Sequence, residues 1–126
     1  MEGNKQRFLA KALESLASAE SDLTAGRYNS CANRCYYACF QAAIAALLAA
    51  DISPTGGWGH DFVRARFAGI LINRRHLYPS ELKNVLPELS FLRQRADYEP
   101  EHMSRTQAER ALCRTRSFVG AVRERS

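Results

Sequence analysis

A short segment near the end of the chain combines side chains suited to acid–base chemistry on an anion. It reads RADYEPEH, with Arg95 at one end, His102 at the other, and Asp97 and Tyr98 between them. Histidine titrates near neutral pH and can move protons, whereas arginine keeps its charge and can hold an anion. The same residues also suit a helix end that runs into a turn, with Arg95 paired to Asp97 and His102 exposed. The segment is therefore a candidate catalytic site, and the rest of the sequence is needed to assign its role.

Size and charge limit the classes of protein that the chain can form. Its 126 residues, 46% of them hydrophobic, suffice for a single domain over 1–126 with a real core. The formal charge of +5 suits an anionic partner such as RNA without requiring one. The N-terminal segment has no apolar signal core, and no stretch approaches the roughly 20 apolar residues that span a bilayer. We expect a cytoplasmic protein that does not bind membranes.

The spacing of apolar residues predicts helices throughout the chain. Apolar side chains recur every three or four residues, and no alternating run of β-branched residues predicts a strand. Short connections after the first and fourth predicted helices favour antiparallel neighbours. We therefore predict an all-α fold, an up-and-down four-helix bundle with an additional fifth helix. The apolar patterns cover 8–23, 28–50, 62–71, 82–96 and 108–122.

Turn and capping residues separate these patterns. Gly26 is expected to end the first helix in a left-handed conformation. Ser80 is a plausible N-cap of the fourth helix, in which Pro87 predicts a kink or a restarted turn because it lacks a backbone donor. Ser104 and Gln107 form a capping-box pattern that opens the fifth helix.

The second predicted helix is apolar on nearly every side, which indicates a central position in the fold. It is also too apolar to be covered by one small bundle alone, which indicates contact with a second chain. We therefore expect a homodimer. Arg34 and Tyr37 are polar-tipped exceptions on this helix, and Arg34 is either salt-bridged inside the bundle or facing a cleft. We predict that both residues bind substrate in a cleft shared by two copies.

Two groups of reactive or charged side chains have simpler interpretations. Cys31, Cys35 and Cys39 recur every four residues, but the fourth cysteine and the histidines are scattered, so packing is favoured over a metal site. No metal or cofactor is predicted. Arg110, Arg114 and Arg125 cluster on one side of the fifth helix, where a solvated face is favoured over contact with phosphate. The loop at 51–59 has three glycines but no following Gly-Lys-Ser/Thr, so it does not match a phosphate-binding loop.

Two longer motifs together resemble one protein family. The first is GRYNSCANRCYYACFQAAIAALLA, followed by Gly59 and His60, and the second is LPELSFLRQRADYEP. In this order they resemble the HEPN family (higher eukaryotes and prokaryotes nucleotide-binding), over about residues 10–121. The resemblance implies a homodimeric helical bundle, commonly encoded beside a minimal nucleotidyltransferase in toxin–antitoxin or defence modules.

The resemblance also implies an activity. Many HEPN proteins are metal-independent endoribonucleases that carry an arginine followed a few residues later by a histidine. Arg95 and His102 match this pattern as catalytic residues, with Asp97 and Tyr98 among the substrate-binding residues, and Arg93 is a competing arginine. The expected function is thus cleavage of RNA by a toxin whose antitoxin is a nucleotidyltransferase. The alternative is a non-catalytic dimeric module that binds a nucleotidyltransferase or a nucleotide.

Overall fold

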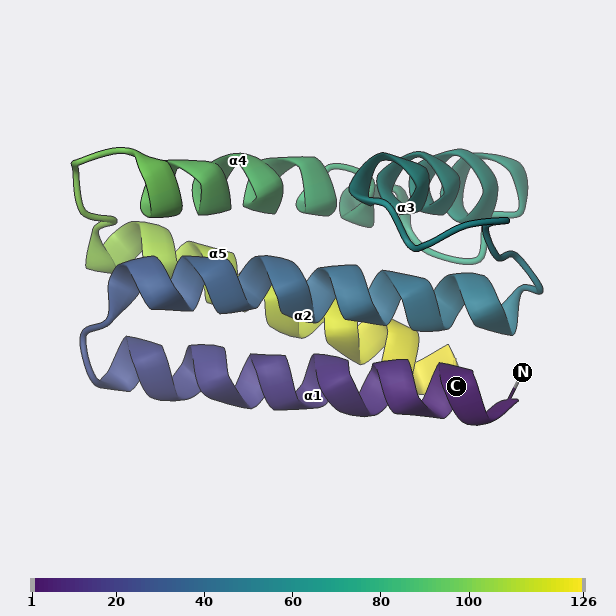
Figure 1. Ribbon diagram of the computed structural model, residues 1–126, viewed down its shortest axis with the longest axis horizontal. Helices are drawn as coiled ribbons and strands as arrows, with labels where there is room; N and C mark the ends of the chain where they lie inside the picture. The colour runs from purple at the N-terminus through teal and green to yellow at the C-terminus, as the bar shows by residue number, and fades with distance from the viewer. Residues whose placement is uncertain (1, 126) are drawn as a thin grey trace.

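Helices make up nearly all of the protein, as the apolar spacing predicts. The computed structural model describes residues 2–125, and this part of the chain contains no strand. The all-α fold is confirmed (Figure 1). The α-helices are α1 Glu2–Thr24, α2 Tyr28–Ala49, α3 His60–Arg66, α4 Val85–Tyr98 and α5 Arg105–Arg125, with a π-helix at Phe67–Arg74 and a 3₁₀ turn at Ser80–Leu82.

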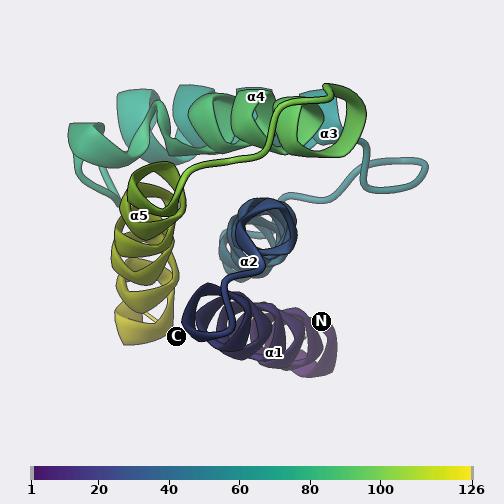
Figure 2. The same ribbon diagram turned by 90° about the vertical axis from the view of Figure 1, so that its left-hand side faces the viewer.

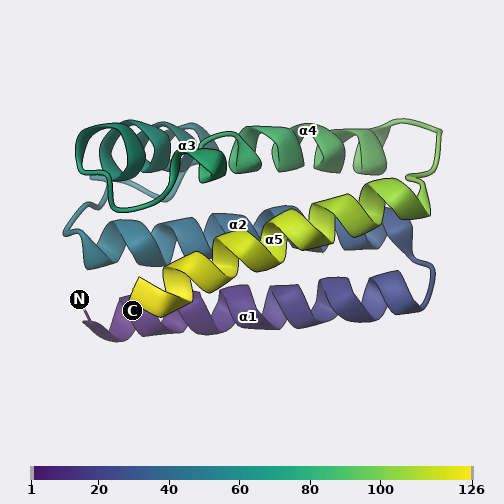
Figure 3. The same cartoon turned by 180° about the vertical axis from the view of Figure 1, so that it is seen from behind.

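Helix α2 lies at the centre of the bundle. It forms an antiparallel hairpin with α1, and on its other side α3 and α4 share one layer (Figure 1). Helix α5 crosses one flank of α2 diagonally, as seen from behind in Figure 3. Figure 2 shows that no helix of residues 2–125 lies on the opposite flank of α2. This uncovered flank becomes relevant to the site described below.

The core surrounds α2 because that helix is apolar on most of its circumference. Thirteen of its residues are buried. Phe67 from the π-helix packs on Phe118 of α5, with ring centroids 4.8 Å apart. Cys31, Cys35 and Cys39 are free thiols with no exposed surface, which confirms their role in packing. Burial raises the pKa of the Cys39 thiol to about 12, so this cysteine is a poor nucleophile.

Replacement of Cys35 by alanine should lower the free energy of unfolding by about 1 kcal/mol, because a fully buried sulfur is removed. Urea denaturation of the two proteins would measure the difference. Metal analysis of the wild-type protein is the second measurement. Stoichiometric zinc or iron that is lost in the Cys35→Ala variant would contradict the packing role.

Two predicted helix ends are confirmed. Gly26 has a φ of +79°, the left-handed conformation that favours glycine, and the chain then turns directly into α2. At the start of α5, the backbone N–H of Gln107 donates to Ser104 Oγ at 3.1 Å, and the N–H of Ser104 donates to Gln107 Oε1 at 3.0 Å. These two bonds form the predicted capping box.

The start of α4 differs from the prediction. Ser80 opens a 3₁₀ turn, and α4 begins only at Val85, after Asn84. Pro87 is therefore the third residue of α4, where its missing N–H would have had no partner within the helix. Of the two predicted outcomes, the kink is absent for this reason and the restarted turn is present, because α4 starts anew at Val85 and then runs without interruption to Tyr98.

The third predicted helix also changes its geometry. It begins as α3 but continues from Phe67 to Arg74 as a π-helix, whose hydrogen bonds span five residues instead of four. Ile72 is thereby buried together with Phe67 and Leu71. The pattern that ends at Leu71 omitted Ile72, because it assumes 3.6 residues per turn.

None of the helices within residues 2–125 is long and apolar enough to cross a membrane.

Candidate functional site

Polar and aromatic side chains from three helices meet where α2, α3 and α4 lie together. We call this set the interhelical cluster. Helix periodicity explains its composition, because residues spaced by three or four lie on one side of each helix. Its members are Asn33, Arg34, Tyr36, Tyr37 and Phe40 on α2, His60 and Arg64 on α3, and Ser90, Arg93 and Asp97 on α4.

Arg93 occupies the middle of the interhelical cluster. Its guanidinium carbon lies 5.2 Å from the ring centroid of Tyr36 and 5.6 Å from that of Tyr37, so it stacks against aromatic faces. Its Nη1 is 3.4 Å from Asp97 Oδ2, and only 15% of its side chain is exposed. The buried Nε has no hydrogen-bond partner within the described chain. Arg93 therefore retains unused capacity to donate to an anion.

His60, the first residue of α3, contacts the same two tyrosine rings as Arg93. Its Nδ1 is 2.5 Å from the Tyr36 hydroxyl, and its ring stacks on Phe40 with centroids 4.6 Å apart. Burial of this stacked ring lowers the pKa of His60, and the positive charges of Arg93 and Arg64 lower it further, against a smaller opposite effect of Asp61. The imidazole is thus neutral at physiological pH.

The contact of His60 with Tyr36 is compatible with a tautomer that leaves Nε2 without a proton. Burial raises the pKa of Tyr36, which has no exposed surface, so its hydroxyl keeps its proton. When Nδ1–H of His60 donates to the Tyr36 oxygen, the lone pair of Nε2 is free to accept a proton from a substrate. A neutral histidine of this kind is suited to act as a general base.

Further charged residues surround this pair. Arg64 donates from Nη1 to Ser90 Oγ at 2.9 Å and from Nη2 to Asp61 Oδ1 at 2.6 Å. Arg34 is half-buried, donates to Asn33 Oδ1 at 2.6 Å and lies over Tyr37. Hydrogen bonds thus fix two guanidinium groups in position near His60 and Arg93. The interhelical cluster can hold a phosphate and move a proton at one place.

The structure brings together three of the six residues predicted from the sequence. Arg34, Tyr37 and Asp97 belong to the interhelical cluster, where Asn33 Nδ2 donates to Asp97 Oδ2 at 3.2 Å. The arginine that joins them is the competing Arg93 and not Arg95. The structure thus places three of the four residues predicted to bind substrate in one cluster, and the arginine nearest them is Arg93 and not the predicted Arg95.

The other three predicted residues lie elsewhere. Arg95 Nε is 3.3 Å from Glu99 Oε1, and Tyr98 is 79% exposed. His102 Nδ1 is 3.1 Å from Asn29 Nδ2, in a cavity of about 410 Å³ at the start of α2. Within a single chain, Arg95 and His102 thus have separate partners, and their catalytic role stays a prediction.

The sequence held signals for the residues that were missed. His60 follows Gly59 in the loop that the family resemblance singled out, and Arg93 is the arginine of the LRQRADY motif. Tyr36, Asn33 and Arg64 carried no signal of their own, because a tyrosine or asparagine in an apolar helix is more often an ordinary hydrogen-bonded core residue.

The lowered pKa of His60 has a consequence for stability. The unfolded chain binds a proton at this residue near the ordinary value of 6.5, whereas the folded protein binds it only at lower pH. The contribution of His60 to stability should thus be complete above about pH 6.5 and be lost as the pH falls below it. Denaturation at a series of pH values would show a weaker acid dependence for His60→Gln. An NMR titration that placed the pKa above its ordinary value would contradict this.

Comparison with known proteins identifies the family. None of the curated proteins compared with the chain is significantly similar to it. The sequence model of the HEPN domain, in contrast, matches residues 6–125, which includes all the elements that form the interhelical cluster. HEPN domains are helical modules associated with RNA cleavage and nucleotide binding. The protein belongs to the HEPN domain family.

Proposed function

We propose that the protein is a metal-independent endoribonuclease, and that the interhelical cluster is its catalytic site. One observation carries the proposal: a neutral His60 lies beside the aromatic-stacked, partly unpaired guanidinium of Arg93. RNA brings its own nucleophile, the 2′-hydroxyl, next to each phosphate. Its cleavage therefore needs only a proton acceptor and fixed positive charge.

The proposed reaction uses these two groups in turn. Nε2 of His60 accepts the proton of the 2′-hydroxyl, whose oxygen attacks the adjacent phosphorus. Arg93 and Arg64 stabilise the charge that builds on the phosphoryl oxygens. The bond from phosphorus to the 5′-oxygen breaks, and this oxygen takes a proton from water or from the imidazolium. The products are a 2′,3′-cyclic phosphate and a free 5′-hydroxyl.

Incubation of the purified protein with labelled single-stranded RNA in EDTA tests this proposal. We expect cleavage that leaves a 2′,3′-cyclic phosphate, and no cleavage at a nucleotide whose 2′-hydroxyl is replaced by hydrogen. A reaction that stops in EDTA, or that cuts DNA equally well, would contradict the mechanism.

We also propose that the active form is a homodimer. Support comes from the flank of α2 that no helix within residues 2–125 covers (Figure 2), and from Arg34 and Tyr37 of α2, which remain half-buried. A second copy there would complete the surroundings of the interhelical cluster. Sedimentation that gives a 14.2 kDa species at micromolar concentration would contradict the dimer.

The proposed biological role is that of a toxin held inactive by a minimal nucleotidyltransferase. The alternative, a non-catalytic module that binds such a partner or a nucleotide, is favoured by the separate positions of Arg95 and His102. Expression of the chain alone discriminates between them. Growth arrest that disappears in a His60→Ala variant supports the toxin, whereas unimpaired growth supports the binding module.

A further inference from the structure

The outward side of α4 exposes two large aromatic side chains. Phe91 is 62% exposed and Tyr98 is 79% exposed, although such residues normally lie inside a protein of this kind. They are seven residues apart, so they lie on the same side of the helix at a separation of about 10 Å. Arg95 lies between them, with its guanidinium carbon 5.9 Å from the Phe91 ring centroid.

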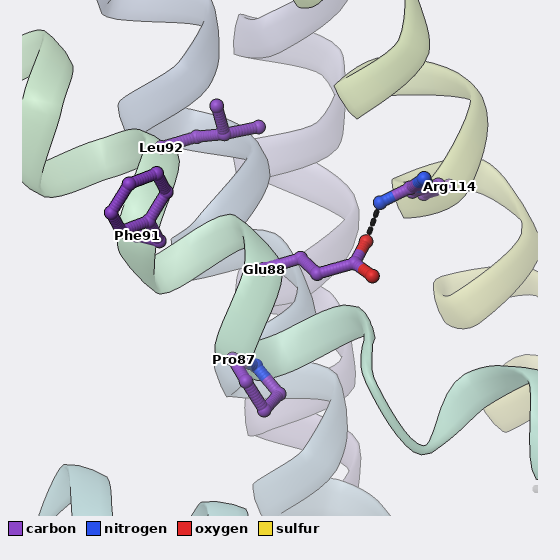
Figure 4. Close-up of a pocket in the computed structure, with 5 residues that line it drawn as sticks. All are labelled: Pro87, Glu88, Phe91, Leu92 and Arg114. Atoms are coloured by element: carbon purple, nitrogen blue, oxygen red, sulfur yellow. Dashed lines mark ion pairs between the residues drawn. The ribbon is translucent and has the colours of Figure 1, made fainter.

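A groove runs beside these aromatic residues. Two adjacent cavities, of about 440 and 220 Å³, share Leu92 and Arg114, and we call them together the α4–α5 groove. Figure 4 shows the larger cavity, with Phe91 on α4 at one edge and Arg114 on α5 opposite. The remaining lining residues are Pro87, Glu88, Gln107, Arg110 and Ala111.

The charge of the α4–α5 groove favours an anion. Two arginines of α5, Arg110 and Arg114, line it, and Arg95 of α4 lies beside Phe91. Glu88 pairs with Arg114, and Glu99 pairs with Arg95. Arg110 has no acidic partner in the part of the chain that the structure describes. Positive charge therefore exceeds negative charge along the groove, and Arg110 is available to bind an anion.

We infer that the α4–α5 groove binds single-stranded RNA. Phe91 and Tyr98 stack on unpaired bases, and Arg110 and Arg114 contact the phosphates between them, the combination that proteins use to bind single strands. A duplex does not fit this chemistry, because its bases stack on each other. This inference rests on the proposed function, because it takes RNA as the substrate. It adds an RNA-binding surface on the opposite side of α4 from Arg93.

A second copy of the chain is a poorer occupant of this surface. A two-fold contact places the same patch on both sides of the interface. The arginines that border the α4–α5 groove would then face their own copies, and like charges in contact oppose association. An RNA strand instead brings the opposite charge.

Fluorescence anisotropy with a labelled 2′-O-methyl oligouridine of roughly 10 nucleotides tests the inference, because blocked 2′-hydroxyls separate binding from cleavage. Phe91→Ala and Tyr98→Ala should each weaken binding by about tenfold, and Phe91→Tyr, which keeps the ring, should not. Both residues are exposed, so the fold should survive, and circular dichroism verifies this.

The contribution of the arginines is measured through salt. Arg110→Ala should reduce the slope of log K against log salt by about 0.7, as expected for one lost contact to a single strand. Arg123→Ala is the matched control, because this exposed arginine lies near the far end of α5 and should leave the slope unchanged. Glu88→Gln releases Arg114 and should strengthen binding.

The outcomes separate this inference from the proposed function. RNA cleavage with wild-type affinity in Phe91→Ala and Tyr98→Ala would overturn the groove and leave the ribonuclease intact. Oligouridine binding that depends on these residues, without any cleavage, would support the groove and overturn the ribonuclease. Aromatic variants that dissociate a dimer while they bind the oligonucleotide normally would assign this surface to a second copy, and the inference would fail.

Discussion

Replacement of His60 by alanine is expected to slow RNA cleavage by about 10²–10⁴-fold, the usual effect of removing a general base. The reason lies in the neutral imidazole, whose Nε2 can accept the substrate proton in the tautomer in which Nδ1–H donates to Tyr36. Single-turnover cleavage of a labelled RNA measures the change. His76→Asn is the matched control: this exposed histidine lies outside the interhelical cluster, and asparagine tolerates its φ of +53°.

Arginine substitutions locate the positive charge that the reaction needs. Arg93→Ala should lower the rate by about 10²–10³-fold, as for other lost charge-stabilising donors. Because Arg93 is largely buried, Arg93→Lys is the more informative variant: it keeps the charge but loses the planar donor set, and an intermediate rate is expected. Arg123→Ala, at an exposed arginine near the far end of α5, serves as the control, and Arg95→Ala tests the alternative site.

The same assay can favour the sequence prediction instead. If Arg95→Ala and His102→Ala abolish cleavage while His60→Ala and Arg93→Lys do not, the catalytic pair lies in RADYEPEH, and the interhelical cluster is structural. Equal activity of all these variants would contradict both assignments. The assay therefore either identifies one of the two candidate sites as catalytic or excludes both.

The largest effect on stability is expected for Phe118→Ala, which should lower the free energy of unfolding by about 3–5 kcal/mol. Phe118 has no exposed surface and its ring packs on Phe67, so alanine would leave a cavity between α5 and the π-helix. That loss is a large part of the roughly 5–15 kcal/mol that a typical domain has.

Urea denaturation of Phe118→Ala and Phe91→Ala provides the comparison. The two substitutions remove the same atoms, but Phe91 is 62% exposed, so its loss should cost less than about 0.5 kcal/mol. Similar losses for both variants would mean that the packing of α5 on the π-helix contributes little to stability.

Local patterns in the sequence were sufficient to predict that the chain is helical and where some of its helices begin or end. Gly26 and the Ser104–Gln107 capping box act within a few residues, so the structure reproduces them as predicted. The start of α4 and the π-helix were not predictable in this way. Ser80 and Pro87 fit several local geometries, and only packing of the layer that contains α3 and α4 selects among them.

The candidate site was harder to predict than the fold. Arg34 and Tyr37 were identified because they are polar-tipped residues on an apolar helix, and Asp97 because it lies within RADYEPEH. The choice of Arg93 over Arg95 as their neighbour depends on which side of α4 faces α2, and residues two apart lie on different sides of a helix. His60 enters the same cluster only through the folded path of the chain after α2, which no pattern within one helix encodes.

The hairpin of α1 and α2 has a consequence for the order of folding. A short turn at Gly26 joins these two long helices, so their contacts form across a small loop, whereas α5 packs on α2 only after a much longer loop has closed. We therefore expect the hairpin to be largely formed in the folding transition state and α5 to dock later. Substitutions in α5 should then mainly accelerate unfolding, whereas substitutions between α1 and α2 should slow folding.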